Sequence, residues 1–156
     1  MIFSVIFAIL LMVAAGCAVQ MARTDWRRRI IPDVYLFPCL LIGLLWVTFV
    51  PGPVSVPDAV LGAAMGYALT LGVGYVFARL TRGAGRPAPA PIGLGDVKLM
   101  ATGGVWLGVT GLAVATVIAC VVGMIWGRRR RVRYVPLATF MVPAAFITLI
   151  GQWILL

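Results

Sequence analysis

The sequence predicts an all-α integral membrane protein, with six transmembrane helices in one domain that covers residues 1–156. Hydrophobic residues make up 63% of the chain and the mean hydropathy is +1.10, whereas a soluble domain is about half apolar. Several apolar runs approach the ~20 residues that cross a bilayer core of ~30 Å. All 13 Lys and Arg residues lie in connections between these runs or at their margins.

The apolar runs and the helix breakers between them set the expected helices. These helices cover residues 2–21, 34–50, 59–78, 96–107, 112–126 and 134–156. Pro32 and the segment Pro51-Gly52-Pro53 separate the first three, because proline lacks the amide donor of a helix. A turn is expected over Gly108–Gly111, and a Pro- and Gly-rich loop over 79–95. Residues 1–22 are read as a transmembrane helix and not a signal peptide, because no positive residue precedes the apolar stretch.

The distribution of cations predicts the topology. Four lie between the first and second runs, four between the third and fourth, and five between the fifth and sixth. Six spans place all three basic loops on one side, which the positive-inside rule assigns to the cytoplasm, with both termini extracytoplasmic. The net charge of +9 is therefore attributed to topology and to attraction for anionic lipid headgroups, and no nucleic-acid partner is expected.

The four acidic residues are functional candidates, because acids at a membrane boundary are rare and costly. The predicted topology puts Asp25 and Asp96 at the same face. Asp33, which starts the second helix, lies there too, and Asp58 is expected to cap a helix on the opposite side. Two neighbouring carboxylates that share a proton can activate a water molecule.

Structural roles compete with this chemistry. If the first helix continues, Arg28 and Arg29 lie three and four residues after Asp25 and can pair with it on the helix surface. Asp96 can simply bind free amides at a helix N-terminus. Residue types alone leave both alternatives open.

Glycines and cysteines suggest packing more than chemistry. Gly62 and Gly66 have the spacing that permits close contact between helices, within one chain or between chains. Three isolated cysteines are expected to pack in apolar surroundings, and the chain has no histidine, so neither a metal site nor a cofactor is expected.

Three segments together resemble one family of membrane proteases. Residues 93–100, Gly-Leu-Gly-Asp-Val-Lys-Leu-Met, resemble the GxGDxKLM signature of type IV prepilin peptidases, which are bilobed aspartic membrane proteases. Asp25, followed by basic residues and Ile31-Pro32-Asp33, resembles the first catalytic aspartate and the Asp…Ile-Pro-Asn segment of that family. Asp33 stands where asparagine is usual, and we expect it to cap the second helix or to tune the pair. Residues 134–140 more loosely resemble a Pro-containing motif that opens the last helix.

The resemblance implies a function. Asp25 and Asp96 would be the catalytic pair, supported by the motif residues Gly93, Gly95 and Lys98. The implied substrate is a prepilin, cut after a short basic leader at the cytoplasmic face of the bacterial inner membrane. Larger members add an N-terminal methyltransferase domain with paired CxxC motifs. This chain is similar to the short form associated with Flp (Tad) pili, and no such domain is expected.

The expected mechanism holds a water molecule between the two carboxylates. One acts as general base while its protonated partner donates to the scissile carbonyl. The loop 79–92 would be a movable cover. A non-enzymatic scaffold or a small transporter is the competing class. A transporter usually carries ionisable groups near mid-membrane, where these runs have none, and a scaffold would tolerate Asp96→Asn.

Overall fold

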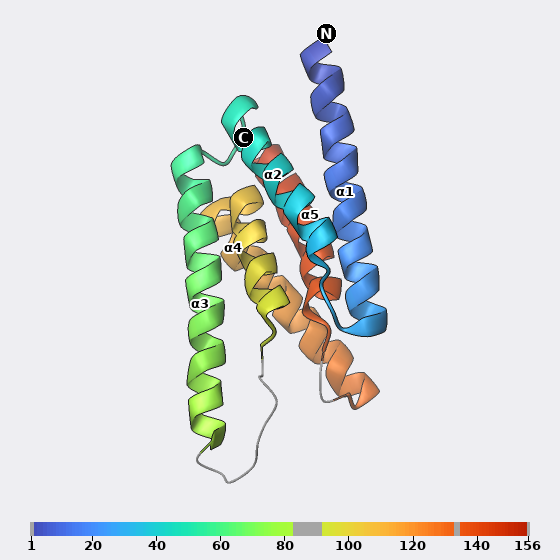
Figure 1. Cartoon of the computed structure of the whole chain (residues 1–156), viewed down its shortest axis with the longest axis vertical. Helices are drawn as coiled ribbons and strands as arrows, with labels where there is room; N and C mark the ends of the chain where they lie inside the picture. The colour runs from blue at the N-terminus through green and yellow to red at the C-terminus, as the bar shows by residue number, and fades with distance from the viewer. Residues whose placement is uncertain (1, 83–91, 133–134, 156) are drawn as a thin grey trace.

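The structure, a computed structural model, describes residues 2–82, 92–132 and 135–155 and is built of helices (Figure 1). The five helices are α1 (Ile2–Arg28), α2 (Asp33–Phe49), α3 (Val56–Arg82), α4 (Leu94–Arg130) and α5 (Leu137–Ile154). Four of them, α1, α3, α4 and α5, are long and apolar enough to cross a membrane, and α2 is a shorter apolar helix of 17 residues. The expected all-helical membrane protein is thus confirmed at this level.

Helix α4 combines the fourth and fifth expected runs. Its 37 residues are interrupted at Gly108, whose backbone angles are φ 65° and ψ −171°. Figure 1 shows the chain folding back there, so that the halves before and after Gly108 run in opposite directions. The expected turn over Gly108–Gly111 was too long: one glycine reverses the chain, because it can adopt a positive φ without a steric penalty.

Two other helix boundaries differ from expectation. Helix α1 continues to Arg28 and so carries Asp25 within it. Helix α3 continues to Arg82, so the loop expected from residue 79 was placed too early. Arg79 Nε donates to the Tyr75 hydroxyl at 2.9 Å, one turn earlier, and the guanidinium lies 5.2 Å from the Tyr75 ring centre. Such i, i+4 contacts stabilise a helix end. The proposed cover falls largely on residues 83–91, which lie outside the described residues.

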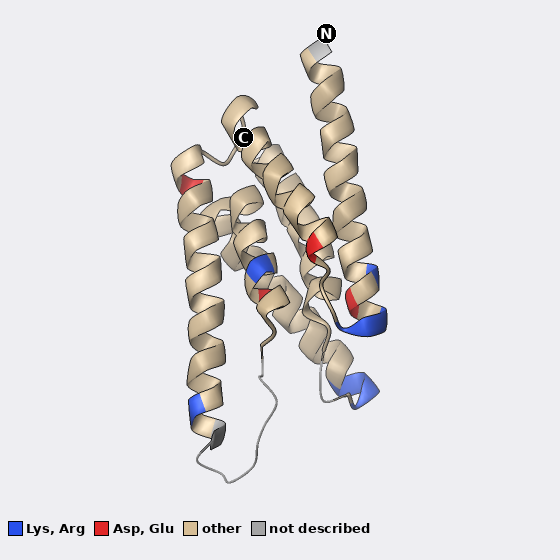
Figure 2. Ribbon diagram, viewed as in Figure 1, with Lys and Arg blue, Asp and Glu red and all other residues tan. Residues whose placement is uncertain are grey.

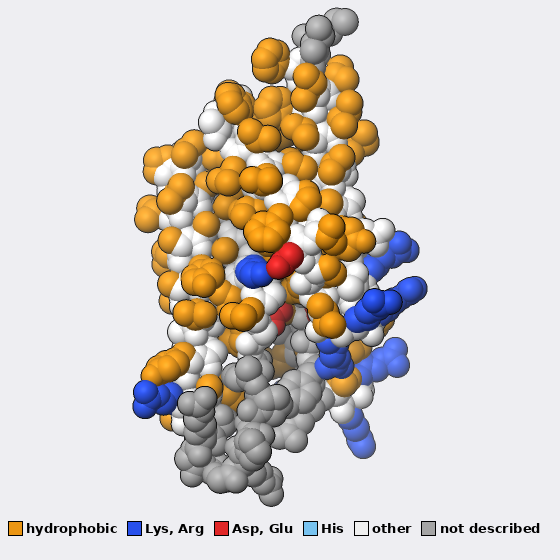
Figure 3. Space-filling model, viewed as in Figure 1, with side chains coloured by type: hydrophobic (Ala, Val, Ile, Leu, Met, Phe, Trp, Pro, Cys, Tyr) orange, Lys and Arg blue, Asp and Glu red, His pale blue; other side chains and the backbone are white. Residues whose placement is uncertain are grey.

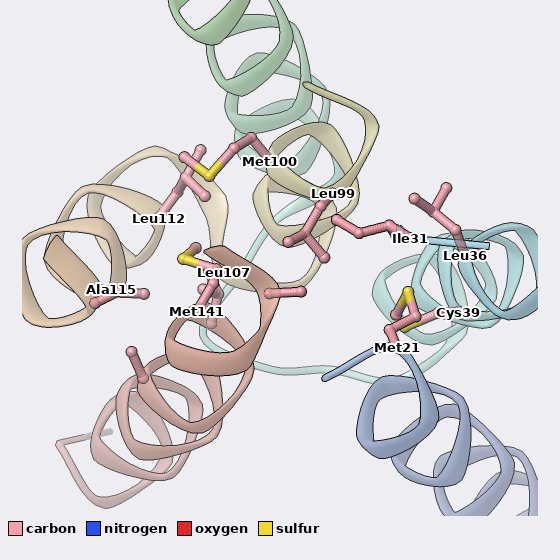
Figure 4. Packing of buried hydrophobic residues seen from close by; sticks show 13 residues of the cluster. Met21, Ile31, Leu36, Cys39, Leu99, Met100, Leu107, Leu112, Ala115 and Met141 are labelled. Atoms are coloured by element: carbon pink, nitrogen blue, oxygen red, sulfur yellow. The ribbon is translucent and has the colours of Figure 1, made fainter. Parts of the chain in front are cut away.

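A buried apolar cluster joins α1, α2, α4 and α5 (Figure 4). Its largest fully buried side chains are Met21, Leu36 and Leu107, one from each of α1, α2 and α4. Cys39 is buried in the same cluster and Cys17 packs against it, as expected for apolar cysteines, whereas Cys120 is exposed. The cluster fixes how the helices that carry Asp25 and Asp96 lie relative to each other.

Helix α3 contacts α4 through glycines. A Cβ atom on Gly62 would lie 2.6 Å from the Gly104 carbonyl oxygen, and one on Gly66 would lie 2.5 Å from that of Met100. Only hydrogen fits at these positions, so the two backbones touch. The glycine pair expected to pack helices therefore does so within the chain.

The outer surface is apolar except at one end. Large hydrophobic side chains are exposed on all five helices, and they cover most of the face in Figure 3. Such continuous apolar surface is typical of contact with lipid. Figure 2 shows most of the charged positions in the lower half of the view, apart from the acidic position in α3. Helix α1 begins and α5 ends toward the other end (Figure 1).

Candidate active site

Asp25 lies in the last turn of α1 and is only 4% exposed. Its Oδ2 atom accepts hydrogen bonds from the backbone amides of Ala138 at 2.8 Å and Thr139 at 3.4 Å. These amides belong to the first turn of α5, where helical N–H groups lack internal partners. The Thr139 hydroxyl donates to the Ala22 carbonyl at 3.1 Å, which joins the same two helices.

Among the described residues, Asp25 does not form the surface ion pair with Arg28 or Arg29 that the sequence allows. Within the described ranges, the one ion pair shorter than 4.0 Å joins Lys98 to Asp33. Arg29 contacts Asp25 through the backbone, where the Arg29 amide donates to the Asp25 carbonyl at 2.9 Å. A carboxylate at the N-terminus of α5 is stabilised by the free amides and by the helix dipole. In the sequence, Pro136 marks the position where α5 begins, and so where the free amides that bind Asp25 are found.

Asp96 is the third residue of α4 and is half-buried. Its Oδ2 atom accepts a hydrogen bond from the Gly93 amide at 3.2 Å. Asp96 therefore binds a free amide at the N-terminus of α4, which is the structural role that the sequence allows. Its Oδ1 atom has no hydrogen bond among the described residues. A Cβ atom on Gly95 would lie 3.1 Å from Ile31 Cβ. Gly95 thus lets the segment after α1 approach the start of α4 closely.

The two helices that carry Asp25 and Asp96 face each other across a cavity. In the described part of the chain α1 and α4 have no close backbone approach, although the Trp26 and Trp126 rings lie 5.1 Å apart. A cavity of ≈ 90 Å³ lies between α1, α2, α4 and α5. Its lining includes Met21, one turn before Asp25, and Leu99, one turn after Asp96.

The cavity is almost wholly apolar. The Thr102 hydroxyl at its wall donates to the Lys98 carbonyl at 3.0 Å, and the Trp106 indole donates to the Cys39 carbonyl at 3.0 Å. Because these polar atoms are already paired, the cavity suits an aliphatic group better than ordered water. The arrangement therefore offers two acids next to an apolar binding space.

Lys98 and Asp33 form an ion pair near the N-terminal ends of α4 and α2. Lys98 Nζ lies 2.8 Å and 2.9 Å from the two Asp33 carboxylate oxygens, and the two side chains are 40% and 49% exposed. The expectation that Asp33 caps α2 was wrong, since α2 has Pro32 at its N-cap and no side-chain cap bond. A separation of 65 residues gave no sequence signal for the pair.

Asp58 caps a helix, as expected, and the helix that it caps is not the one that carries it. It is in the first turn of α3, and its Oδ1 atom accepts a hydrogen bond from the Val109 amide at 3.2 Å. Asp58 therefore caps the second half of α4, where the helix resumes after Gly108. No three His, Cys, Asp or Glu side chains are grouped for a metal among the residues that the structure describes.

A buried and a half-buried carboxylate on two helices of an apolar bundle define a membrane protein with a candidate acid site, and sequence comparison gives the family. The chain matches the model of the type IV leader peptidase family over residues 5–128, and it belongs to this family of proteases. It is 36% identical over 146 residues to a prepilin leader peptidase/N-methyltransferase of Dickeya chrysanthemi, which covers 89% of this chain and 44% of that protein.

Other curated relatives carry the same name. The protein of Aeromonas salmonicida is 30% identical over 133 residues, 81% of this chain and 43% of that protein. The protein of Pseudomonas putida is 30% identical over 148 residues, 94% of this chain and 49% of that protein. The chain thus spans less than half the length of these relatives. No solved structure gives a significant match.

Proposed function

We propose that the chain is a membrane-embedded aspartic endopeptidase that removes the short basic leader from Flp-like type IV prepilins. The observation that supports the proposal is that Asp25 and Asp96 each lie one helical turn from a residue lining the same apolar cavity, Met21 and Leu99 respectively. Family membership supports the reaction class, and the relatives' printed name supports a prepilin as substrate. The Flp-like substrate rests on the family resemblance and is not part of the relatives' printed name.

In the proposed mechanism a water molecule lies between the two carboxylates. The ionised carboxylate takes a proton from the water as the oxygen attacks the scissile carbonyl. The protonated partner donates a hydrogen bond and then a proton to the carbonyl oxygen, which gives a gem-diol. The carboxyl that took the water proton then gives it to the leaving amine nitrogen as the C–N bond breaks. The other carboxylate takes a proton from the diol as the new carboxyl group forms, which restores the starting pair. Because the two acids titrate as a unit, the base is not assigned to one of them. The amides of α5 hold Asp25 in place. A Cβ at Gly93 would meet only Asp96 and Gly95, so an extended peptide can approach Asp96 there, whereas the space beside Gly95 is taken by Ile31.

The apolar cavity suits the first aliphatic side chain of the mature pilin segment. Met21 and Leu99 place its wall one turn from each acid, so a peptide bond held between the acids would have a neighbouring side chain within reach of it. A side chain bound in the cavity would exclude bulk water from that side of Asp25 and Asp96. Only the reacting water molecule would then remain between the two acids.

The proposed topology has six membrane crossings, with α4 crossing twice and turning at Gly108. Both termini would be extracytoplasmic and the three basic loops would face the cytoplasm of the bacterial inner membrane. Residues 94–107 rise about 21 Å at ~1.5 Å per residue, which is less than a hydrocarbon core of ~30 Å. With Gly108 at the outer boundary, Asp96 would therefore lie below the cytoplasmic surface of the lipid. The cation distribution and the gathering of charges at one end support this orientation.

A cleavage assay in membranes tests the proposal. The chain is co-expressed with Flp-type prepilins, and leader removal is followed by gel shift and N-terminal sequencing. We expect Asp25→Asn and Asp96→Asn each to abolish cleavage while inserting at the parent level. Asp33→Asn is the matched control, because it removes a third acid from the same face without touching the pair. Cleavage that survives both dyad substitutions would refute the mechanism. If the parent leaves every prepilin uncut while a known prepilin peptidase cuts them, the proposed substrate is wrong.

A further inference from the structure

A groove between α1 and α5 lies on the outside of the bundle, next to the candidate active site. It has a volume of ≈ 540 Å³, within the range of about 300–1,000 Å³ that is usual for ligand sites. We call it the α1/α5 groove. Six of the residues that line it matter for the argument: Val19, Arg23, Trp26, Arg27, Val142 and Phe146.

One end of the groove is cationic. Arg23 and Arg27 lie one helical turn apart on α1, so their guanidinium groups extend from the same face. Neither forms an ion pair among the described residues, and Asp25, which lies between them in sequence, is buried and bonded to the amides of α5. Two exposed and unneutralised guanidinium groups match a phosphate, which Arg binds through two parallel hydrogen bonds.

The other end of the groove is apolar. Val19 lies two turns before Arg27 on α1, and Phe146 and Val142 face the groove from α5. Trp26 lines the cationic end, and Trp is enriched where lipid headgroups meet hydrocarbon. The groove therefore runs from a cationic end near the charged face to an apolar end toward the middle of the membrane, which is the polarity of a phospholipid.

We propose that the α1/α5 groove binds one anionic phospholipid, with its phosphate on Arg23 and Arg27 and an acyl chain along Val19 and Phe146. Charge complementarity favours this occupant over the substrate leader, because a basic leader would be repelled by both arginines. Thr139 lines the groove and also donates its amide to Asp25. An occupied groove would thus brace the end of α5 that holds Asp25.

Lipid binding is measured on the full-length chain by native mass spectrometry, after titration with phosphatidylglycerol and, separately, phosphatidylcholine. We expect one tightly retained phosphatidylglycerol. In R23Q/R27Q its affinity should fall about 30-fold, which corresponds to about 2 kcal/mol for two arginines near a membrane surface. R128Q/R129Q is the matched control, with the same loss of charge at exposed positions of the same end, and it should retain the lipid.

A second variant tests the groove separately from its charge. Val19→Trp keeps both arginines and fills the apolar end, so it should also lose the retained phosphatidylglycerol. Equal retention by R23Q/R27Q and R128Q/R129Q, equal binding of phosphatidylcholine by the parent, or full retention by Val19→Trp would each overturn the proposal. A loss of prepilin cleavage in R23Q/R27Q with lipid binding unchanged would assign the groove to the substrate instead. Because the readout is lipid binding, failure here is distinct from failure of the proposed protease activity.

Discussion

Gly66→Ala tests whether the contact between α3 and α4 positions the candidate active site. The added Cβ would lie 2.5 Å from the Met100 carbonyl oxygen, and ordinary contact begins at 3.4 Å, so the two backbones would have to separate by about 0.9 Å. Met100 lies one turn after Asp96 in the same half of α4. Overpacking of this kind costs about 1–3 kcal/mol. A displacement of ~1 Å at a reacting group can cost about 100-fold in rate.

Gly72→Ala is the matched control, because a Cβ on Gly72 meets nothing within 4 Å in the same helix. Alanine there should leave stability unchanged or raise it, by up to about 1 kcal/mol in water-based scales. Thermal unfolding in detergent and prepilin cleavage in membranes are measured for both variants. We expect Gly66→Ala to lower both the unfolding midpoint and kcat/KM. We expect Gly72→Ala to lower neither. Equal stability and cleavage of the two variants would refute the idea that backbone contact at Gly66 sets the position of Asp96.

Two further changes test the turn in α4 and the surface ion pair. Gly108→Ala should destabilise the fold by about 2 kcal/mol or more, because φ is 65° there and a Cβ would clash with Asp58; adding Asp58→Ala should relieve part of this loss, so that unfolding midpoints of the single and double variants are non-additive. Lys98→Asp should reduce cleavage and the exchanged pair K98D/D33K should recover most of it. Since the pair is exposed, Asp33→Asn alone should cost no more than about 1 kcal/mol, or about fivefold in kcat/KM. A failure of the exchange to restore cleavage would show that Lys98 acts on the substrate or on Asp96 rather than through Asp33.

The candidate site illustrates how far sequence reasoning could go. The scarcity of acids and their place at helix ends make Asp25 and Asp96 candidates, and the resemblance to the prepilin peptidases is what implies that they form the catalytic pair. Their immediate partners were not predictable in the same way. Asp25 is bonded to amides of α5 that lie 113 residues away, and no periodicity links those positions. The local alternative, an ion pair with Arg28 or Arg29, looked equally reasonable until the tertiary contacts were known.

The roles of Asp33 and Asp58 show the same limit. Asp33 was expected to cap α2 or to tune the acid pair, and Asp58 to cap a helix, which are roles that local sequence suggests for an acid at a helix start. Asp33 instead pairs with Lys98, and Asp58 caps the second half of α4. A carboxylate takes whichever donor the packing brings within reach, so chain neighbours do not decide its partner.

The sequence by itself determined that this protein is an all-helical membrane protein and which acids could carry chemistry, because hydropathy and charge act residue by residue. It also indicated the close packing of Gly62 and Gly66, since small side chains remove a local barrier to contact. Only the tertiary structure decided that Gly108 reverses α4 within a single residue and that an apolar cavity lies between the helices of Asp25 and Asp96. These features depend on contacts between residues distant in sequence, whose geometry is fixed only when all the helices pack together.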